Sequence, residues 1–466
     1  MKYLCIYVRA YAHCKTAALP RSRITLPCLR AKRYLLFLLI LPLLAVSCGK
    51  ASVAEEKRLA ERILQDTLMD RVSAMAKETV RGGFNAGDGY GEVWIRDYNT
   101  FIELAMEVMP DSLIQDNLLS FFRFQGETGD IVDGFIDIRR AERSAIGYKY
   151  RYSALEPRYA AHKNTVETDQ ESSLVQAVWR YVTKSGNRAF LQQTVDGKTV
   201  EQRLEQALEY LLNERCDARY GLLWGATTAD WGDVQPEHPW GVELDENSHR
   251  CLDIYDNAFF VIAMNHFLDL TEREEARQRW ADLRDRMKSR IRRHLWDAEK
   301  QKFIPHVYLE GSPFPPDFDE HAVYYHGGTA MAIEAGLLTK EEIAASNRAM
   351  LANVKASGAP SIGLTLYPPY PKGFFRNSGM YPYGYQNGGD WTWFGGRMIR
   401  QLIRSGFVQE ARDEVQPMLE RAVKNGGFFE WYRIDGTPSG SGTFRGSAGV
   451  LYQAIEDFRH WAQIHR

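Results

Sequence analysis

The sequence predicts an all-α fold, an (α/α)6 toroid in which six helical hairpins close into a ring. Three observations predict it. Apolar residues recur with helical spacing along most of the chain, whereas the alternation typical of strands is scarce. The links between predicted helices alternate between short and long. Finally, two predicted helices are apolar around most of their surface, as the inner wall of a ring requires.

Twelve helices follow from the spacing of apolar residues. Their ranges are 54–80, 97–108, 112–124, 171–184, 200–213, 254–270, 272–296, 327–335, 340–352, 390–404, 408–423 and 444–463. Helices 254–270 and 327–335 are the apolar pair, whereas 272–296 is strongly charged and belongs on the outside. Short links produce antiparallel hairpins, and long loops in a compact domain are usually functional. If all the long loops lie on one side, they converge on one mouth of the ring.

The first residues predict an export signal rather than part of the fold. Residues 1–33 carry eight Lys and Arg and no acid, and an apolar run follows up to Ser47. This run is shorter than the roughly 20 residues of a membrane span, although a short membrane anchor is the alternative. Leu44-Ala-Val-Ser-Cys48 resembles a bacterial lipobox. The resemblance implies a signal segment over 1–48, a lipid on Cys48, and a location on the periplasmic or cell-surface side of a bacterial membrane.

Composition and motifs exclude several classes of protein. Lys+Arg 58 against Asp+Glu 60 gives a net charge of -2, which argues against a nucleic-acid binder. Beyond Cys48 only Cys216 and Cys251 remain, so the chain is not a disulfide scaffold and has no zinc-type spacing. Nucleotide-binding loops and metalloprotease or serine-hydrolase motifs are absent from the sequence. Residues 51–466 therefore predict one domain, expected to be monomeric, without a metal or cofactor.

Aromatic residues gather in the predicted long loops. Trp 11 + Tyr 24 + Phe 22 gives 57 residues, or 12% of the chain. Seven tryptophans lie in or beside these loops, namely Trp94, Trp224, Trp231, Trp240, Trp391, Trp393 and Trp431. Sugar rings lie on aromatic faces while their hydroxyls need Asp, Asn, Arg and Glu. A mouth lined with both kinds of side chain predicts an oligosaccharide or polysaccharide substrate. The alternative is that the tryptophans form small cores for the loops themselves.

Polar residues stand beside these aromatics. Arg96 and Asp97 open helix 97–108, where the pair would hold sugar hydroxyls or Asp97 would simply cap the helix. Asp256 has the same two alternatives at the start of helix 254–270. Loop 214–253 contains Asp230, Trp231 and Asp233. The remaining candidates for substrate binding are Trp94, Asn387, Asp390, Trp391, Trp393, Trp431 and Arg445.

The loop order and motifs resemble those of six-hairpin glycosidases. The nearest are glycoside hydrolase family 63, the trehalases and the amylo-α-1,6-glucosidase part of debranching enzymes. The resemblance rests on Val93-Trp-Ile-Arg-Asp97, Asn387-Gly-Gly-Asp-Trp-Thr-Trp393 and Glu430-Trp-Tyr with Phe444-Arg-Gly446. It implies that Glu430 is the general base and Asp230 the general acid. Asp233 is a close rival, because the neighbours of Asp230 differ from the family's Ser-Gly-x-Asp.

The chemistry of acetal cleavage fits these residues. One carboxylic acid protonates the leaving oxygen, and in an inverting enzyme a carboxylate about 6.5–9.5 Å away activates water. Together with the resemblance, which implies α-linked glucosides or related oligosaccharides as substrates, this chemistry predicts an inverting glycosidase. One alternative is a polysaccharide lyase or unsaturated-uronyl hydrolase, which needs a cationic mouth, although the loops hold more acids than basic residues. Another is a surface glycan-binding lipoprotein without catalysis.

Overall fold

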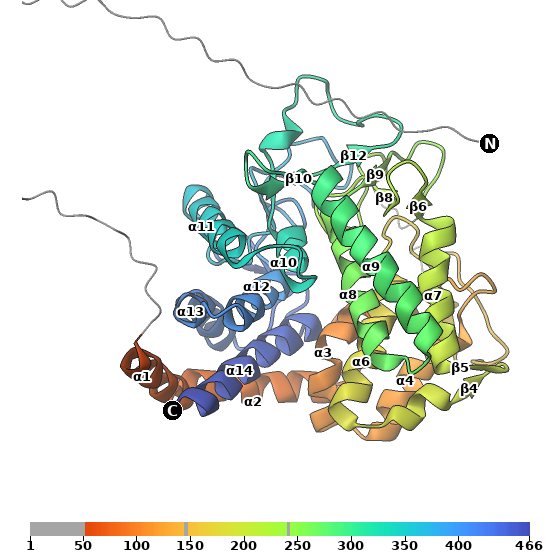
Figure 1. Ribbon diagram of the computed structural model, residues 1–466, viewed down its shortest axis with the longest axis horizontal. Helices are drawn as coiled ribbons and strands as arrows, with labels where there is room; N and C mark the ends of the chain where they lie inside the picture. The colour runs from red at the N-terminus through yellow and green to blue at the C-terminus, as the bar shows by residue number, and fades with distance from the viewer. Residues whose placement is uncertain (1–51, 144–147, 240–242) are drawn as a thin grey trace, which may run out of the picture. The chain divides into compact units, whose positions relative to one another are not determined.

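The computed structural model describes residues 52–143, 148–239 and 243–466. Six of its helices form a closed inner ring (Figure 1). They are α3 (Ile95–Val108), α6 (Gln170–Ser185), α8 (Ile254–Leu270), α10 (His326–Glu334), α12 (Thr392–Arg404) and α14 (Arg445–His465). Each packs on the next in this order, and α14 closes the ring on α3. The predicted (α/α)6 toroid is confirmed.

A second set of helices surrounds the ring. These are α1 (Val53–Leu64), α2 (Thr67–Arg81), α4 (Asp111–Arg123), α7 (Val200–Glu214), α9 (Glu274–His294), α11 (Lys340–Ser357) and α13 (Val408–Asn425). The predicted contrast between the two layers is clear in one hairpin. Helix α8 is buried around most of its surface, whereas the charged α9 buries only one stripe that includes Trp280 and Ile291. The apolar pattern therefore decides which helix faces the axis.

Two local predictions differ from the structure. The single helix expected over 54–80 is broken into α1 and α2 between Leu64 and Thr67. The cause is Asp66, whose carboxylate accepts the N–H groups of Leu68 at 2.9 Å and Met69 at 3.1 Å and so starts a new helix. The short helix α5 (Ile138–Ala141), inside a long loop, was not predicted.

The loops carry short antiparallel strands, and all but β4 and β5, which precede the outer helix α7, belong to the long loops. Two three-stranded sheets consist of β1 (Val93–Trp94), β2 (Gly134–Asp137) and β3 (Tyr159–His162), and of β8 (Gly225–Ala226), β9 (Arg250–Leu252) and β12 (Val307–Tyr308). The two-stranded pairs are β4 (Thr194–Val195) with β5 (Lys198–Thr199), β6 (Cys216–Asp217) with β7 (Leu222–Leu223), β10 (Trp296–Asp297) with β11 (Lys302–Phe303), β13 (Tyr324–Tyr325) with β14 (Leu366–Tyr367), and β15 (Trp431–Tyr432) with β16 (Pro438–Ser439).

These strands and a few backbone bonds join the six long loops, those that lead into inner helices, into a closed collar. Strands β1–β3 join the loops before α3 and α6, β8–β12 those before α8 and α10, and β13–β14 those before α10 and α12. Backbone bonds complete the circle: Ala226 N to Val166 O at 2.9 Å, Asp390 N to Tyr432 O at 2.9 Å and Arg445 N to Ala86 O at 2.7 Å. The collar holds the loop residues at the amino ends of the inner helices.

Residues 51–466 form one compact unit. The predicted signal segment and Cys48 lie outside the described residues. Trp240 does as well. Among the helices of the described part, none combines the length and the apolar character needed to cross a membrane.

Candidate functional site

All six inner helices begin at the collar, because each long loop leads into one of them. The amino end of a helix carries a partial positive charge and favours carboxylates nearby. The two predicted catalytic loops lie opposite each other. Asp233 is in the loop before α8 and Glu430 in the loop before α14, and these two helices are three positions apart in the ring of six. The two carboxyl groups thus come from opposite sides of one mouth.

Glu430 is held through one of its two oxygens. Its Oε2 accepts the Tyr90 hydroxyl at 2.8 Å and the backbone N–H of Ser441 at 3.1 Å. Burial raises the pKa of Glu430, the donors Tyr90 and Ser441 oppose that rise, and the negative charge of Asp233 adds to it. No hydrogen bond to Oε1 occurs among the described residues. This oxygen is therefore the one left for chemistry.

A polar clasp fixes the Glu430 loop to the loop before α3. Asp88 accepts the Ser441 hydroxyl, and it also accepts both the backbone N–H and the hydroxyl of Thr443 at 2.9 Å each. The hydroxyl of Ser441 first, and then the Thr443 groups, hold the pKa of Asp88 at about 2 although burial opposes them. The clasp keeps Tyr90 and Glu430 in register across two loops.

Asp233 is partly exposed and lies within electrostatic reach of the rest of the mouth. Its negative charge contributes to raising the pKa values of Glu430, Asp97 and Asp133, although burial is the largest cause for each. Its Oδ1 accepts the side-chain amide of Gln386 at 2.7 Å. Asp233 is thus the residue whose charge acts on each of the other three acids of the mouth.

Asp230 has a different environment. Only 2% of its surface is exposed, and its Oδ2 and Oδ1 accept the backbone N–H groups of Gly327 at 2.7 Å and Gly328 at 2.9 Å. These groups belong to the first turn of α10, so Asp230 anchors that helix. Burial raises its pKa well above the ordinary value. Asp230 also adopts φ +58, in the left-handed region that non-glycine residues rarely enter.

Arg96 is the cation at the centre of the site, and it is already paired. Its guanidinium contacts Glu167, bonds Asp169 at 2.7 Å and lies 5.5 Å from the centroid of Trp231. Asp97 follows it in the first turn of α3, which begins at Ile95, so Asp97 is not the helix cap. Burial raises the pKa of Asp97 to about 8, Arg96 opposes the rise, and Glu430 adds to it.

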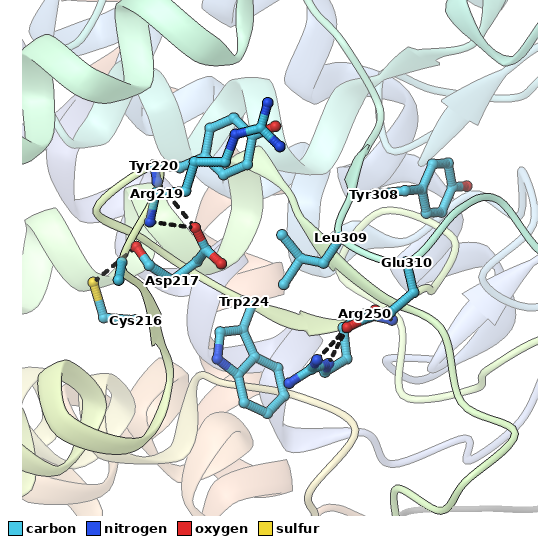
Figure 2. Close-up of a pocket in the computed structure, with 10 residues that line it drawn as sticks. Cys216, Asp217, Arg219, Tyr220, Trp224, Arg250, Tyr308, Leu309 and Glu310 are labelled. Atoms are coloured by element: carbon cyan, nitrogen blue, oxygen red, sulfur yellow. Dashed lines mark hydrogen bonds and ion pairs between the residues drawn. The ribbon is translucent and has the colours of Figure 1, made fainter.

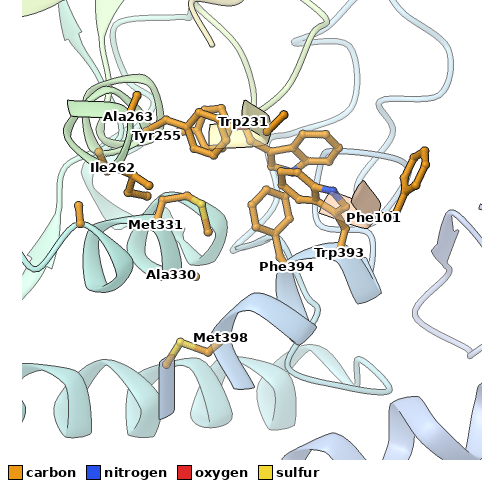
Figure 3. Close-up of a cluster of buried hydrophobic side chains, with 14 of the residues drawn as sticks. Phe101, Trp231, Tyr255, Ile262, Ala263, Ala330, Met331, Trp393, Phe394 and Met398 are labelled. Atoms are coloured by element: carbon orange, nitrogen blue, oxygen red, sulfur yellow. The ribbon is translucent and has the colours of Figure 1, made fainter. Parts of the chain in front are cut away.

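Most of the predicted sugar-binding tryptophans are buried. Trp231, Trp391, Trp393 and Trp431 are each less than a tenth exposed. Figure 3 shows Trp231, Trp393 and Phe394 in one aromatic cluster, in which Trp231 stacks on Trp393 with ring centroids 5.5 Å apart and Phe394 packs against both at an angle. Trp94 is only half-buried. The four buried rings belong to the hydrophobic core cluster, and their sugar-binding role stays a prediction.

The other predicted binding residues have partners inside the protein. The Asn387 side chain bonds the backbone of Tyr370 and Met380, Asp390 pairs with Arg421 at 2.8 Å, and Arg445 bonds Asn85 at 2.7 Å. Asp256 is buried, and its own N–H bonds the Asp253 carboxylate at 2.8 Å, so Asp253 is the residue that caps α8. These contacts explain the residues structurally and give no support to a sugar-binding role.

Several residues of the mouth were not singled out by the sequence. They are Tyr90, Asp133, Tyr148, Tyr385 and Gln386. The three tyrosines are half-buried, and negative charge from Asp233 contributes to raising each of their pKa values, after burial as the largest cause. Burial raises the pKa of Asp133 to about 7, and Arg96 opposes the rise. Asp133 has no sequence signal, because only the fold brings it within reach of Arg96.

Two cavities lie near these loops. A space of about 10 Å³, enough for one water molecule, is lined by Asp230, Asp253, Asp256 and neighbours. A larger pocket of about 340 Å³ lies between the β6–β7 hairpin and Leu309 (Figure 2). There Arg250 bonds Glu310 at 2.8 Å and also lies 5.0 Å from the centroid of Trp224. Within the described part of the chain, no cluster of His, Cys, Asp and Glu is arranged to hold a metal ion.

Comparisons with known proteins support the fold. No family model matches the chain, and no curated protein matches it in sequence. Solved structures do match. An uncharacterized conserved protein of Thermus thermophilus has a TM-score of 0.60 at 14% identity, covering 82% of this chain and 98% of that one.

Two similar structures are named enzymes. The GH63 mannosylglycerate hydrolase of Thermus thermophilus, in complex with glucose, has a TM-score of 0.58 at 16% identity and covers 83% of this chain and 99% of its own. The rhamnosidase from Klebsiella oxytoca with rhamnose bound has a TM-score of 0.56 at 14% identity and covers 84% and 64%. At these identities the likeness establishes the shared fold. The resemblance to six-hairpin glycosidases, family 63 included, is therefore confirmed for the architecture.

Proposed function

We propose that the protein is a glycoside hydrolase whose catalytic pair is Asp233 and Glu430. The observation that carries the proposal is the placement of these two carboxyl groups on opposite sides of the mouth, within electrostatic reach of each other. Acetal cleavage needs such a pair, with one group on each face of the sugar ring. The fold that the chain shares with a mannosylglycerate hydrolase and a rhamnosidase supports the same class of reaction.

Glu430 acts as the general base. Two donors on Oε2 stabilise its ionised form, and Oε1 is left to take a proton from water. Asp233 replaces Asp230 as our preferred general acid. Both oxygens of Asp230 bind the backbone of α10, whereas Asp233 has a partly exposed side chain facing the other acids of the mouth.

The pair supports an inverting reaction. Inversion requires the two carboxyl groups to stand far enough apart to admit a sugar and a water molecule, and groups carried by opposite loops of the ring suit this requirement. The proton on Asp233 passes to the glycosidic oxygen, and the bonding electron pair leaves with that oxygen. Water attacks the anomeric carbon as its proton passes to Oε1 of Glu430.

The charges of the mouth favour a neutral sugar. Asp97, Asp133, Asp233 and Glu430 are gathered there, and the guanidinium of Arg96 is already paired with Glu167 and Asp169. A uronic acid would bring its carboxylate beside Asp97 and Asp133, whose raised pKa values mark a site that disfavours negative charge, while Arg96 is already paired. This argument supports α-linked glucosides or related neutral oligosaccharides over the substrates of a lyase or an unsaturated-uronyl hydrolase.

The test combines substrate, stereochemistry and variants. Aryl glycosides and disaccharides of α-D-glucose, α-D-mannose and α-L-rhamnose are the probes, with NMR of the anomer first released. We expect the opposite anomer, and Asp233→Asn to lower kcat at least about 100-fold. The matched variant Asp230→Asn should mainly lower Tm. Retained configuration would exclude the inverting mechanism, and an inactive Asp230→Asn beside an active Asp233→Asn would reverse the two roles.

We also propose that the protein is exported and carries a lipid on Cys48, as the lipobox resemblance implies. Radiolabelled palmitate should enter the wild-type protein and not Cys48→Ser. Equal labelling of both would contradict the lipid anchor.

A further inference from the structure

We propose that Gln386 is the positioning residue of the acid: its amide confines the transferable proton of Asp233 to Oδ2 and stabilises the carboxylate that forms when this proton leaves. The inference rests on the proposed function, in which Asp233 is the general acid. Gln386 itself does not touch the substrate. It acts from the loop before α12 on a residue in the loop before α8.

One side-chain amide binds two parts of Asp233. The Gln386 Nε2 donates to Asp233 Oδ1 at 2.7 Å, and its Oε1 accepts the backbone N–H of Asp233 at 3.3 Å. Gln386 has no exposed surface. Because one amide bonds both the main chain and the carboxyl group of Asp233, it fixes the position of this residue and the rotation of its side chain together.

The surroundings leave little freedom to Gln386. The next residue, Asn387, bonds the backbone of Tyr370 and Met380, and the Gln386 carbonyl accepts the Thr365 hydroxyl at 3.1 Å. On the other side, a Cβ at Gly232 would lie 2.8 Å from the Gln386 Oε1, so the glycine admits the amide. The preceding Tyr385 has φ +42, a strained conformation of the kind that gathers at functional sites.

The polarity of the contact assigns the proton. The amide nitrogen is a donor only, so the oxygen that faces it, Oδ1, must be an acceptor. The acidic hydrogen of Asp233 is then carried by Oδ2. As this hydrogen moves to the glycosidic oxygen, negative charge develops on the carboxyl group. The hydrogen bond from Nε2 strengthens at that moment and therefore lowers the barrier more than it stabilises the ground state.

Substrates that differ in their leaving group separate this role from a general loss of structure. We expect Gln386→Leu to lower kcat/KM about 30-fold on phenyl α-glycosides, which need protonation to leave. On 2,4-dinitrophenyl α-glycosides, which leave without it, the loss should be less than about threefold. The glycosides of α-D-glucose, α-D-mannose and α-L-rhamnose are tested in parallel. Equal losses on both leaving groups would overturn the proposal.

A matched control lies in the same loop as Asp233. Gln235 is equally buried, donates to the Glu243 carbonyl at 2.8 Å and has no bond to Asp233. Gln235→Leu should show the same small loss on both leaving groups. Gln386→Glu adds a pH profile. The introduced carboxyl group, when protonated, can donate as the amide does, so activity on phenyl glycosides should recover as the pH falls through its pKa, which burial raises above the ordinary value of a glutamate. A profile identical to that of Gln386→Leu would contradict the donor role.

A measurement without substrate keeps this proposal separate from the proposed function. Gln386→Leu, Asp233→Ala and the double variant form a cycle for Tm. If the amide holds Asp233, the double variant should lose clearly less than the sum of the two single losses. Additive losses would overturn the contact. If the wild-type protein cleaved none of the probes but the coupling were strong, the proposed glycosidase activity would be refuted while the contact between Gln386 and Asp233 would be supported.

Discussion

The two ends of the inner ring bury charges in opposite ways. At the collar, Asp97, Asp133 and Asp233 lie within electrostatic reach of Arg96, whose guanidinium is already paired with Glu167 and Asp169. Deeper in the ring, arginines predominate. Arg180 and Arg397 both lie 3.8 Å from Glu334, and Arg400 bonds Asp457 at 2.8 Å. Acids near helix amino ends and arginines toward carboxyl ends both suit the helix dipoles.

The two ends of the ring differ in how their buried acids are paired with cations, not in how deeply those acids are buried. Glu334 is almost as buried as Asp97, and burial alone would raise its pKa, but Arg397 and Arg180 hold it at about 2. Burial is the main cause that raises the pKa of Asp97 to about 8; Arg96 opposes the rise, and Glu430, Asp133 and Asp233 add to it. Unbalanced buried charge is costly, so a protein retains it where chemistry needs it. The contrast supports our proposal that the collar is the functional end and that the deep arginines are structural.

The largest expected effect is at Glu430. Glu430→Gln keeps the shape and an acceptor for Tyr90 but cannot take a proton, so kcat should fall about 1,000-fold. Because the carboxylate is not balanced by a cation, Tm should change little. Steady-state kinetics and thermal unfolding at pH 7 measure the two effects. A large loss of Tm would mean that Glu430 is structural after all.

The same substitution at the other end should have the reverse result. Glu334→Gln leaves Arg180 and Arg397 buried with less counter-charge, and we expect a loss of about 3 kcal/mol in the free energy of unfolding. Because Glu334 ends α10 far from the collar, kcat should stay within about twofold. Urea unfolding monitored by tryptophan fluorescence gives the stability. An unchanged urea midpoint would contradict the structural role that we assign to the deep ion pairs.

The sequence predicted the ring well for a physical reason. Helices α8 and α10 had to be inner ones because apolar residues surround them, and the alternation of link lengths indicated which ends carry the loops. The collar could not be predicted in the same way. Its stability comes from pairs such as Asp88 with Thr443, which lie far apart in the chain and leave no periodic signal.

The candidate site residues show the same contrast between what sequence patterns predict and what only the fold brings together. Composition identified loops rich in Trp and acids, and the charge of Asp233 contributes to raising the pKa of Glu430 after burial as the largest cause, but the catalytic roles of the two residues stay a prediction. Sequence could not show that Trp391 and Trp393 are buried, since the letters of a core tryptophan and a sugar-stacking one are the same. Nor could it rank Asp233 above Asp230, because the two backbone N–H donors that occupy Asp230 are nearly a hundred residues away.

A smaller effect should appear at Asp97, with a defined pH dependence. Its pKa is raised from the ordinary value to about 8, so its contribution to stability is full below pH 4 and is lost as the pH rises toward 8. Asp97→Asn removes the titration. We expect the variant to be about 2 kcal/mol more stable than wild type at pH 8 and nearly equal at pH 4. Denaturant unfolding at both pH values measures this, with kcat expected to fall. Equal differences at the two pH values would contradict the charge assignment.

The smallest effect is expected at Asp88. This residue lies in the collar, but its carboxylate is stabilised by hydrogen-bond donors, as the deep acids are stabilised by arginines. Its pKa is held at about 2 by the hydroxyl of Ser441 and the groups of Thr443, so its contribution is full above pH 4 and is lost as the pH falls toward 2. Asp88 is exposed, and solvent screening leaves only about 0.5 kcal/mol of this for Asp88→Asn to remove at pH 7. Asp88 and Asp97 should therefore respond to pH in opposite directions from the same collar. Thermal unfolding of Asp88→Asn and Asp97→Asn between pH 3 and pH 8 tests this expectation. If both variants became more stable than wild type at high pH, the position of these acids in the ring rather than their pairing would determine how they respond to pH.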